Sequence, residues 1–269
     1  MKTVVITGSA RGFGFEMIKL FRKKGLNVVL CDISEENLNF AKEELEKIKS
    51  KGKVLSFKTD ITKEDEVNSL INNTLKEVKT IDIWINNAGV NQPNKPIWEV
   101  DSSSIDRLID VDLKGTIICS KLIMNVMIKQ KSGQIYNVEG YGSNDAKMLG
   151  LSLYGTTKRA ITYFTEALAK ECDELNTNVL IGKITPGIMI TNFISTALGD
   201  GEKIELDEKT KKVYNILGDY PEDIAKFMVD KIINNNKNNV KFTWLTNRKA
   251  AWRFMTSFTN KRDFFNENK

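Results

Sequence analysis

The stretch Thr3-Val4-Val5-Ile6-Thr7-Gly8-Ser9-Ala10-Arg11-Gly12-Phe13-Gly14 decides the fold of this chain of 269 residues. Its β-branched run predicts a strand buried on both faces, and the glycines that follow predict a tight turn. The turn opens a segment in which Met17, Ile18 and Phe21 recur at helical spacing. A strand, a glycine-rich turn and a helix in this order let the backbone approach a phosphate group, which the helix N-terminus binds. A simple tight turn explains the glycines equally well, so the remaining sequence has to distinguish the two.

Short β-branched runs alternate with longer segments of helical period along the chain. The helix expected from Lys63 is the clearest, because apolar residues recur every three or four positions from Val67 to Val78. Right-handed crossovers then predict an α/β fold: a Rossmann-type, doubly wound and mainly parallel sheet of six or seven strands with helices on both faces. The strands are expected at residues 3–6, 27–31, 54–58, 81–85, 134–138 and 178–184.

No linker rich in Pro, Gly or Ser divides the sequence, so residues 1–269 are expected to form a single domain, with residues 237–269 as its basic, aromatic C-terminal extension. After Pro186 the pattern loosens, and residues 195–212 are polar enough for a mobile loop or short helices. No apolar run approaches the roughly 18 residues that a bilayer requires, and the first residues lead straight into the glycine-rich turn. We therefore expect neither a membrane span nor a cleaved leader.

Histidine is absent, which excludes Ser/His/Asp hydrolysis, histidine zinc sites and imidazole acid–base catalysis. The three cysteines, Cys31, Cys119 and Cys172, are scattered and odd in number. We therefore expect buried thiols in a reducing cytoplasm and no metal site. The net charge of +5 is concentrated in the C-terminal extension, so we expect no nucleic-acid partner.

Asp32 lies eighteen residues beyond Gly14, at the end of the second expected strand. Its carboxylate would accept hydrogen bonds from the adenosine ribose and repel a 2′-phosphate, which favours NAD over NADP. Arg11 in the turn could meet a 2′-phosphate and leaves NADP open. Two polar stretches, Asp60-Ile61 and Asn86-Asn87-Ala88-Gly89, follow the third and fourth strands, where open α/β sheets bind ligands. Each of them alone could be a turn.

The stretch Tyr154-Gly155-Thr156-Thr157-Lys158 begins a segment of helical period. Residues four apart share a face of a helix, so Lys158 is expected beside Tyr154. A neighbouring ammonium stabilises the phenolate, and we expect it to lower the pKa of Tyr154 and make it a proton donor to a carbonyl oxygen. The alternative is a purely structural role, in which the tyrosine packs on the apolar stem of the lysine.

Taken together, these motifs resemble the short-chain dehydrogenase/reductase family over about residues 1–195. They occur in the order and at the spacing that the family shows. The resemblance implies a nicotinamide cofactor, hydride transfer between it and a carbonyl or an alcohol, Tyr154 as acid/base, and Lys158 on the ribose and on Tyr154. With the turn and Asp32, the expected cofactor-binding residues are Gly8, Ser9, Arg11, Gly12, Phe13, Gly14, Asp32, Ile33, Asp60, Ile61, Asn87, Ala88, Gly89, Tyr154, Lys158, Pro186, Gly187, Ile188 and Thr191.

A narrower resemblance is to the chlorophyll(ide) b reductase branch of that family. It rests on Asn137-Val138-Glu139-Gly140-Tyr141-Gly142-Ser143, on Tyr154-Gly155-Thr156-Thr157-Lys158-Arg159, and on Trp244-Leu245-Thr246, Lys249-Ala250 and Arg253-Phe254 in the tail. That branch implies reduction of a ring-attached formyl group to hydroxymethyl on a large tetrapyrrole. Its plant members carry a transit peptide and an NADP-type second strand, and this chain shows neither.

The chain departs from the family pattern at two positions. The family's active-site Ser would fall near Tyr141, and the nearest hydroxyl is that of Ser143, which matches the Ser of the narrower branch. Ser143 would hydrogen-bond the carbonyl oxygen of the substrate and polarise it. Alternatively, the loop could present Tyr141 or a backbone amide to that oxygen, and Ser143 could cap a turn. In the family, an Asn on a helix anchors a water that leads protons to the Lys. Asp112 aligns with this Asn. Asp112 would pair with Lys158 and raise the pKa of its ammonium. The predicted catalytic residues are Asp112, Ser143, Tyr154 and Lys158.

Apolar residues near the site indicate a hydrophobic pocket, although core packing explains them almost as well: Met148, Leu149, Leu151, Met189 and Phe193. In the tail, Ala251, Met255 and Phe258 form a helical stripe flanked by basic residues. Packing on the domain or on another subunit is favoured for this stripe over a membrane-surface helix or lid. The family resemblance also implies a homodimer or homotetramer built on the helices that contain Asp112 and Tyr154.

The sequence thus predicts a cytoplasmic, NAD(P)-dependent enzyme that interconverts a carbonyl (aldehyde or ketone) and an alcohol on a bulky, apolar small molecule. A hydroxysteroid or bile-acid dehydrogenase would share every motif and differ only in residues 191–212. A non-catalytic NAD-binding sensor or scaffold is the alternative of a different class, because of the departures at Asp112 and Ser143.

Overall fold

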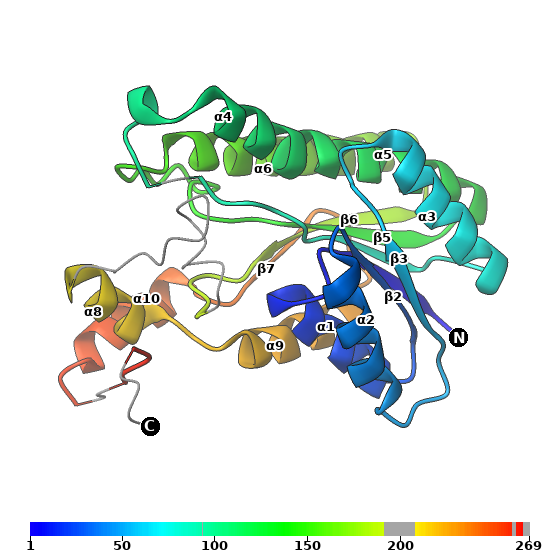
Figure 1. Cartoon of the computed structure of the whole chain (residues 1–269), viewed down its shortest axis with the longest axis horizontal. Coiled ribbons are helices and arrows are strands. Elements are labelled where there is room, and N and C mark those ends of the chain that lie inside the picture. The colour runs from blue at the N-terminus through cyan, green and yellow to red at the C-terminus, as the bar shows by residue number, and fades with distance from the viewer. Residues whose placement is uncertain (93, 191–207, 260–261, 266–269) are drawn as a thin grey trace.

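Seven strands form one sheet in the part of the chain that the structure, a computed structural model, describes: residues 1–92, 94–190, 208–259 and 262–265 (Figure 1). Their order is β3-β2-β1-β4-β5-β6-β7, and every neighbouring pair is parallel. The strands are β1 (Thr3–Thr7), β2 (Asn27–Asp32), β3 (Val54–Lys58), β4 (Ile83–Asn86), β5 (Gly133–Val138), β6 (Val179–Thr185) and β7 (Val240–Thr243). The predicted Rossmann-type, doubly wound sheet is confirmed. The predictions for Thr191 and Phe193, and for residues 195–207, lie outside the described residues.

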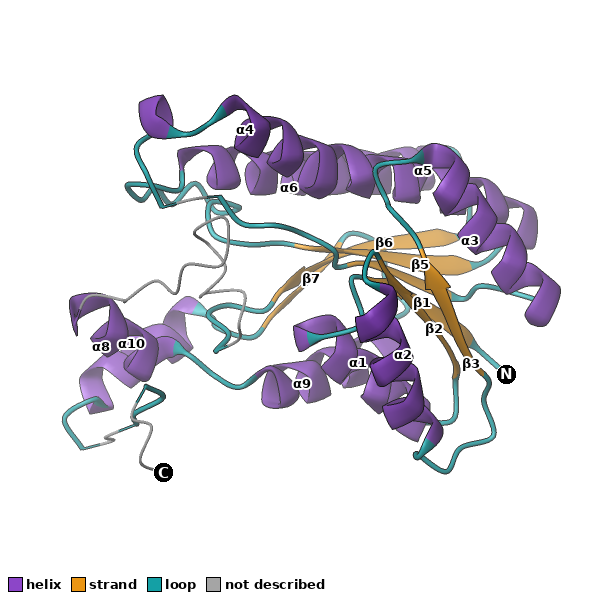
Figure 2. Ribbon diagram, viewed as in Figure 1, coloured by secondary structure: helices purple, strands orange, loops and turns teal. Residues whose placement is uncertain are grey.

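Helices cover both faces of the sheet, as the alternating pattern predicts (Figure 2). On one face lie α3 (Glu64–Glu77), α5 (Thr116–Gln130) and α6 (Ser152–Glu174), and on the other α1 (Gly12–Lys23), α2 (Glu35–Glu46) and α9 (Pro221–Ile233). The two faces have separate apolar cores, because side chains alternate along a strand: Val4 and Ile6 pack in one core and Val5 in the other. The helix expected from Lys63 is confirmed as α3.

One long helical segment changes its winding where it passes the site. The helix α4 (Ser102–Leu108) continues through a π-helical stretch, η2 (Ile109–Gly115), into α5. Such π-helical stretches are rare and often occur at functional sites. A short 3₁₀ turn, η1 (Ile97–Glu99), precedes α4.

The C-terminal extension contains the edge strand β7 and the helix α10 (Asn247–Thr256), which packs on α8 (Glu208–Leu217). Figure 1 shows α8 and α10 together at one end of the molecule, away from the sheet. The structure thus shows the extension packing on its own domain. The predicted stripe of Ala251, Met255 and Phe258 is nevertheless exposed. In the described residues we find no helix that combines the length and apolar character needed to cross a bilayer.

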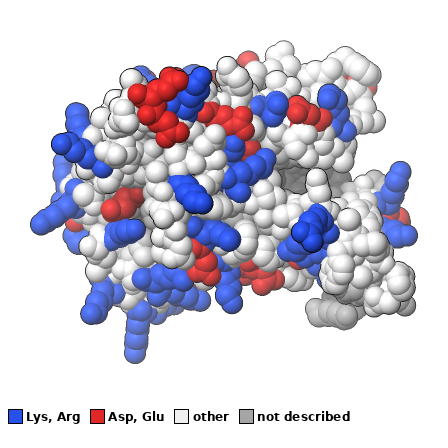
Figure 3. Space-filling view, turned by 180° about the vertical axis from the view of Figure 1, so that it is seen from behind, with Lys and Arg blue, Asp and Glu red and all other residues white. Residues whose placement is uncertain are grey.

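The structure shows where charged side chains lie on one face of the molecule and where the thiols lie. On the face that Figure 3 shows, positive and negative side chains are interspersed. All three cysteines are free and buried, as predicted. Burial raises the pKa of the Cys31 thiol to about 12 and raises the pKa of Cys119 well above its ordinary value. These thiols are therefore structural, and their expected cytoplasmic location stays a prediction.

The side chains of Thr7 and Asn87 join the turn after β1 to the turn after β4. Thr7 Oγ1 accepts hydrogen bonds from the backbone amides of Asn87 and Ala88, at 3.0 Å each. The Asn87 side chain returns bonds to the carbonyls of Thr7 and Gly8, at 3.0 and 2.9 Å. Gly8 has a φ of +61°, and a Cβ there would lie 2.7 Å from the Cα of Ala88, so the contact requires glycine.

We expect Thr7→Val to lower the free energy of unfolding by about 1–3 kcal/mol, because an isosteric apolar side chain leaves two backbone amides without their acceptor. Urea denaturation measures the change. Thr259→Val, at an exposed position, is the control. A loss for Thr7→Val no larger than the roughly 0.5 kcal/mol typical of surface substitutions would contradict this account.

Candidate active site

The carboxyl ends of four neighbouring parallel strands bring the predicted segments to one edge of the sheet. The glycine-rich turn follows β1, and the segment Asn87-Ala88-Gly89 follows β4. The loop from Glu139 follows β5, and Pro186-Gly187 follows β6. Segments that are far apart in the sequence therefore meet where ligands bind in open α/β sheets.

The glycine-rich turn leaves space for a ligand at the N-terminus of α1. Gly12 has a φ of +59°, and a Cβ there would meet no atom within 4 Å, whereas Gly14 packs against the side chain of Asn87. Arg11 is exposed at the N-cap of α1. Ser9 and Phe13 are buried, and the Ser9 hydroxyl donates to the carbonyl of Ile6 at 2.7 Å. Ser9 and Phe13 therefore have only their backbone to offer a ligand in this arrangement.

Asp32 lies at the end of β2 beside that turn. Its carboxylate accepts hydrogen bonds from the amides of Ala10, at 3.4 Å, and Ser34, at 3.1 Å. The neighbouring Ile33 is 64% exposed and borders the same edge. Asp32 is thus both a turn carboxylate and a group placed near the turn, and the two interpretations are compatible.

Asp60, after β3, is held mainly by its own turn. Its Oδ1 accepts from the amide of Thr62 at 3.0 Å and from the Thr62 hydroxyl at 2.7 Å. Partial burial acts to raise the pKa of this carboxyl, but the Thr62 bonds and the Lys63 ammonium outweigh it, and the pKa is lowered. Ile61 is buried and lies against Gly115. The predicted cofactor contacts of these two residues stay a prediction.

Three of the four predicted catalytic residues, Tyr154, Lys158 and Asp112, lie in a row. The Lys158 ammonium lies 3.0 Å from Oδ2 of Asp112 and 5.3 Å from the centre of the Tyr154 ring. Lys158 follows Tyr154 by one turn of α6, and Asp112 comes from η2. Oδ1 of Asp112 accepts from the amide of Val90 at 2.7 Å, which ties η2 to the loop after β4. Asp112 is fully buried, and only 8% of the Lys158 side chain is exposed.

This ion pair stays charged although it is buried. Burial acts to lower the pKa of the Lys158 ammonium, but the attraction of Asp112 outweighs it and the pKa is raised, as we expected. Burial also raises the pKa of Asp112, against the effects of Lys158 and of the Val90 amide. The raised pKa of Asp112 favours a neutral carboxyl, whereas the raised pKa of Lys158 favours an ammonium that faces a carboxylate. The 3.0 Å contact and the Val90 donor both fit a carboxylate, so we assign the charged pair.

The expected effect of Lys158 on Tyr154 is wrong in its net sign. Lys158 does act to lower the pKa of the phenol, but burial is the larger effect and raises it. Asp112, and Tyr214 on α8, raise it further. The sequence shows a cation one helical turn away; it does not show how far the site excludes water.

The Tyr154 hydroxyl lies close to Gly140. A Cβ at Gly140 would overlap the hydroxyl oxygen of Tyr154 and would lie 3.1 Å from Cγ of Lys158. Ser143 is buried; its hydroxyl accepts from the amide of Gly140 at 3.2 Å and donates to the carbonyl of Lys158 at 3.4 Å. Because a hydroxyl has one proton, this geometry is that of a turn cap. The role of Ser143 on a carbonyl stays a prediction.

Sequence reasoning did not assign two polar residues that support this row. The Gln92 side chain accepts the amide of Tyr154 at 2.8 Å and so holds the start of α6. Glu139, whose side chain is fully buried, accepts from the hydroxyls of Thr162, at 2.8 Å, and Thr185, at 2.6 Å, and pairs with Lys241 at 2.7 Å. The sequence shows Glu139 directly after a strand, but it shows neither its burial nor its partners, which come from three other elements.

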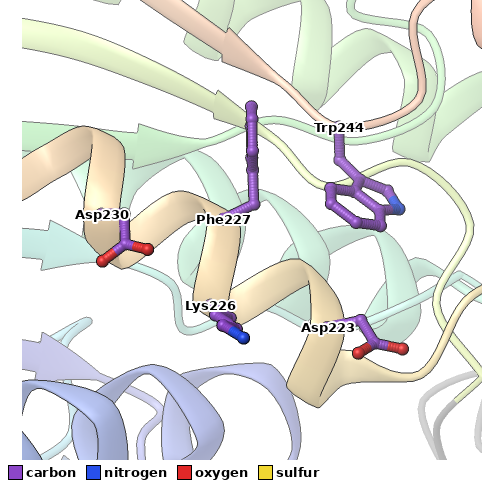
Figure 4. Close-up of a pocket in the computed structure, with 5 residues that line it drawn as sticks. All are labelled: Asp223, Lys226, Phe227, Asp230 and Trp244. Atoms are coloured by element: carbon purple, nitrogen blue, oxygen red, sulfur yellow. The ribbon is translucent and has the colours of Figure 1, made fainter.

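A cavity of about 370 Å³ lies elsewhere, between α9 and Trp244 (Figure 4). Its lining residues, Asp223, Lys226, Phe227, Asp230 and Trp244, include none of the predicted site residues. Cations of the chain itself already face these groups: Lys249 Nζ lies 3.2 Å from the centre of the Trp244 ring, and Lys24 pairs with Asp230 at 2.8 Å. We therefore place the candidate site at the strand ends.

Comparison with known proteins identifies relatives over most of the chain. The short chain dehydrogenase family model matches residues 2–200. Over 282 residues the chain is 29% identical to "Probable chlorophyll(ide) b reductase NYC1, chloroplastic" of Arabidopsis thaliana, covering 99% of this chain and 55% of that protein. It is 31% identical over 232 residues to chlorophyll(ide) b reductase NOL, chloroplastic, of the same plant, covering 85% and 64%. The chain thus spans only about half to two thirds of these relatives.

A smaller relative is a diacetyl reductase forming (S)-acetoin from Staphylococcus epidermidis, 31% identical over 209 residues, which cover 77% of this chain and 78% of that protein.

Solved structures share the fold at lower identity. A 3-ketoacyl-(acyl-carrier-protein) reductase from Brucella melitensis complexed with NADH has a TM-score of 0.79 at 22% identity, covering 92% of this chain and 98% of that one. A 7α-hydroxysteroid dehydrogenase complexed with NADH and 7-oxo glycochenodeoxycholic acid has a TM-score of 0.76 at 23% identity, covering 91% and 96%. Because the family model matches residues 2–200, the chain belongs to the short chain dehydrogenase family.

Proposed function

We propose that this protein is an NAD(P)-dependent oxidoreductase that interconverts a carbonyl and an alcohol on a bulky, apolar substrate, with Tyr154 as acid/base. The observation that carries the proposal is the row of Tyr154, Lys158 and Asp112 at the strand ends beside the glycine-rich turn. Members of the matched family supply the class of reaction, and the row supplies the proton chemistry.

The residues at the strand ends fit a dinucleotide. The open space at Gly12 and the N-terminus of α1 suit a pyrophosphate, and Asp32 stands where it would bind ribose hydroxyls. The acceptor position of Asp32 supports NAD, while the exposed Arg11 keeps NADP as the second candidate. When bound, the nicotinamide supplies or accepts the hydride.

Tyr154 transfers the proton of the reaction. Its raised pKa keeps the phenol protonated near neutral pH, which is the form that donates a proton to a carbonyl oxygen. The phenolate left behind would lie next to the Lys158 ammonium, whose charge stabilises it. Asp112 holds that ammonium in place and keeps it protonated.

Exposed apolar side chains on two adjacent loops support a bulky substrate. Trp98 is 80% exposed, and Met148 and Leu149 are 55% and 79% exposed. The two loops meet, because a Cβ at Gly150 would overlap the side chain of Asn94. A formyl-bearing tetrapyrrole, a ring ketone of the steroid class and a small diketone are the substrate classes to compare, since the names of the relatives and structural neighbours include all three.

The proposal includes a homodimer or homotetramer in the cytoplasm. The exposed apolar side chains of Ile117 and Ile128 on α5, and of Tyr163 on α6, support an interface on these helices. A non-catalytic nucleotide-binding protein remains the rival of a different class, motivated by the carboxylate at Asp112.

Tyr154→Phe should reduce turnover by about 10²- to 10⁴-fold, because it removes the proton donor and keeps the ring. The loss of NADH or NADPH absorbance is followed with formyl-tetrapyrroles, ketosteroids, diacetyl and simple aldehydes. Cofactor binding should be retained by the variant. Equal rates for the two proteins would refute the role of Tyr154, and cofactor binding without turnover of any substrate would favour the non-catalytic rival.

Asp112→Asn should move the alkaline loss of reductase activity to lower pH. Reduction needs a protonated donor, so activity falls as pH rises through the pKa of Tyr154. Asp112 raises the pKa of both Tyr154 and Lys158, and an amide at this position lowers both. The profile of kcat/KM against pH measures the shift. Asp110→Asn, which breaks only an exposed pair with Lys114, is the control, and an unmoved or opposite shift in Asp112→Asn would contradict the mechanism.

Gly140→Ala should lower kcat by about 10- to 100-fold, because the added methyl displaces the Tyr154 hydroxyl from the reacting position. Gly155→Ala is the matched control: it is adjacent to Tyr154 in sequence, yet a Cβ there meets its nearest atom at an ordinary 3.6 Å. Steady-state kinetics of the two variants are compared with their cofactor affinities. A similar loss in both variants would show that the contact with Gly140 is not the cause.

A further inference from the structure

Four hydrogen bonds from the C-terminal extension converge on one carboxylate, Asp219, which follows α8. The Trp244 indole donates to it at 2.6 Å, Arg253 donates two bonds at 2.7 and 2.9 Å, and Arg262 donates at 3.1 Å. Only 10% of the Asp219 side chain is exposed. We call Asp219, Trp244, Arg253 and Arg262 the C-terminal clamp. Charge-assisted bonds of this kind, with a bidentate arginine among them, are among the strongest that side chains form.

The backbone of Asp219 continues the connection to the candidate site. Its amide donates to the carbonyl of Ile188 at 3.1 Å, and its carbonyl accepts from the amide of Ile190 at 3.0 Å, as a parallel bridge opposite Met189. Residues 188–190 come directly after Pro186-Gly187 at the end of β6. One residue therefore joins the C-terminal extension to a segment at the ligand-binding edge of the sheet.

Two further contacts bring the extension to the same segment. The Trp244 amide donates to the carbonyl of Thr185 at 3.0 Å. Gly187 has a φ of +78°, and a Cβ there would lie 2.6 Å from Cβ of Leu245. The turn after β6 thus packs directly on the residue that follows Trp244.

The cations of the clamp also complete α8. Arg253 donates to the carbonyl of Leu217 at 2.9 Å, and Arg262 donates to the carbonyls of Ile216 and of Gly218, the latter at 3.0 Å. These are carbonyls at the C-terminal end of a helix, where positive charge is favourable. Burial acts to raise the pKa of Asp219, but the bonds from Arg253 and Trp244 outweigh it and the pKa is lowered. These bonds and the lowered pKa fit a charged Asp219 carboxylate facing the Arg253 and Arg262 cations.

We propose that Asp219 is a positioning residue of the cofactor site, through which Trp244, Arg253 and Arg262 fix the backbone of residues 188–190. This rests on the proposed function, because it requires a nicotinamide cofactor at the edge where these residues lie. The extension then acts as a working part of the cofactor pocket.

The experiment measures the dissociation constant of NADH and NADPH, the KM for the cofactor and the thermal midpoint for the full chain and its variants. Asp219→Asn removes the charge and keeps the shape. Trp244→Phe removes one donor, keeps an aromatic ring, and serves where Asp219→Asn does not fold. Asp230→Asn is the matched control, since it makes the same change at an exposed carboxylate that pairs with Lys24.

We expect Asp219→Asn to raise the cofactor dissociation constant and KM by about five- to tenfold or more, Trp244→Phe to raise them less, and Asp230→Asn to leave them unchanged. A lowered thermal midpoint with a dissociation constant within about twofold of wild type would overturn the proposal, because the clamp would then be structural only. Wild-type protein that binds neither cofactor would overturn the proposed function first. The two failures are therefore distinguishable.

Discussion

The close contact between Gly8 and Ala88 is the constraint on which the rest of the site depends. It lies between β1 and β4, which is where the strand order changes direction: the chain moves outward through β2 and β3, then returns to continue through β4. Loops on either side of such a point diverge and leave a crevice. Because Thr7 and Asn87 bond across the contact and the Val90 amide donates to Asp112, the glycine-rich turn is joined to the loop after β4, and that loop is joined to Asp112.

The carboxylate at Asp112 changes the electrostatics of the row in a way that an amide would not. An ammonium that is paired at 3.0 Å with a carboxylate has less net field to offer a phenol than an unpaired one. Asp112 itself also raises the pKa of Tyr154, so it acts together with burial and against Lys158. In the proposed function, this balance keeps Tyr154 in the protonated form that can donate a proton.

Much of the fold follows from sequence because its signals are local. Six strands and α3 were predicted from apolar runs and helical spacing, and the sheet contains them. The strand β7 was not assigned, since four residues within a basic extension carry too little pattern to identify a strand. It is the edge strand and pairs on one side with β6.

The site was predicted less completely because its contacts are not local. Tyr154, Lys158 and Asp112 were found from spacing and family resemblance, and they do meet. The closeness of Gly140 to the Tyr154 hydroxyl could not be found that way. Counting residues back from Tyr154 identifies the nearest serine hydroxyl in the sequence. The path of the loop decides which residue lies beside the Tyr154 hydroxyl in the structure. The clamp on Asp219 joins residues 25 to 43 positions apart, beyond the reach of any periodicity. The sign of the Tyr154 pKa shift depends on the exclusion of water, which is a property of the assembled fold.

The three buried thiols make the protein convenient for spectroscopy. Cys31 and Cys119 are fully buried and Cys172 is only 3% exposed, and burial raises the pKa of all three, so maleimide and iodoacetamide reagents should react slowly with the native thiols of the folded protein. A cysteine introduced at an exposed position, for example on α10, is then the reactive thiol of the whole chain. A fluorophore or spin label attached there reports the movements of the C-terminal extension while all three native cysteines stay in place.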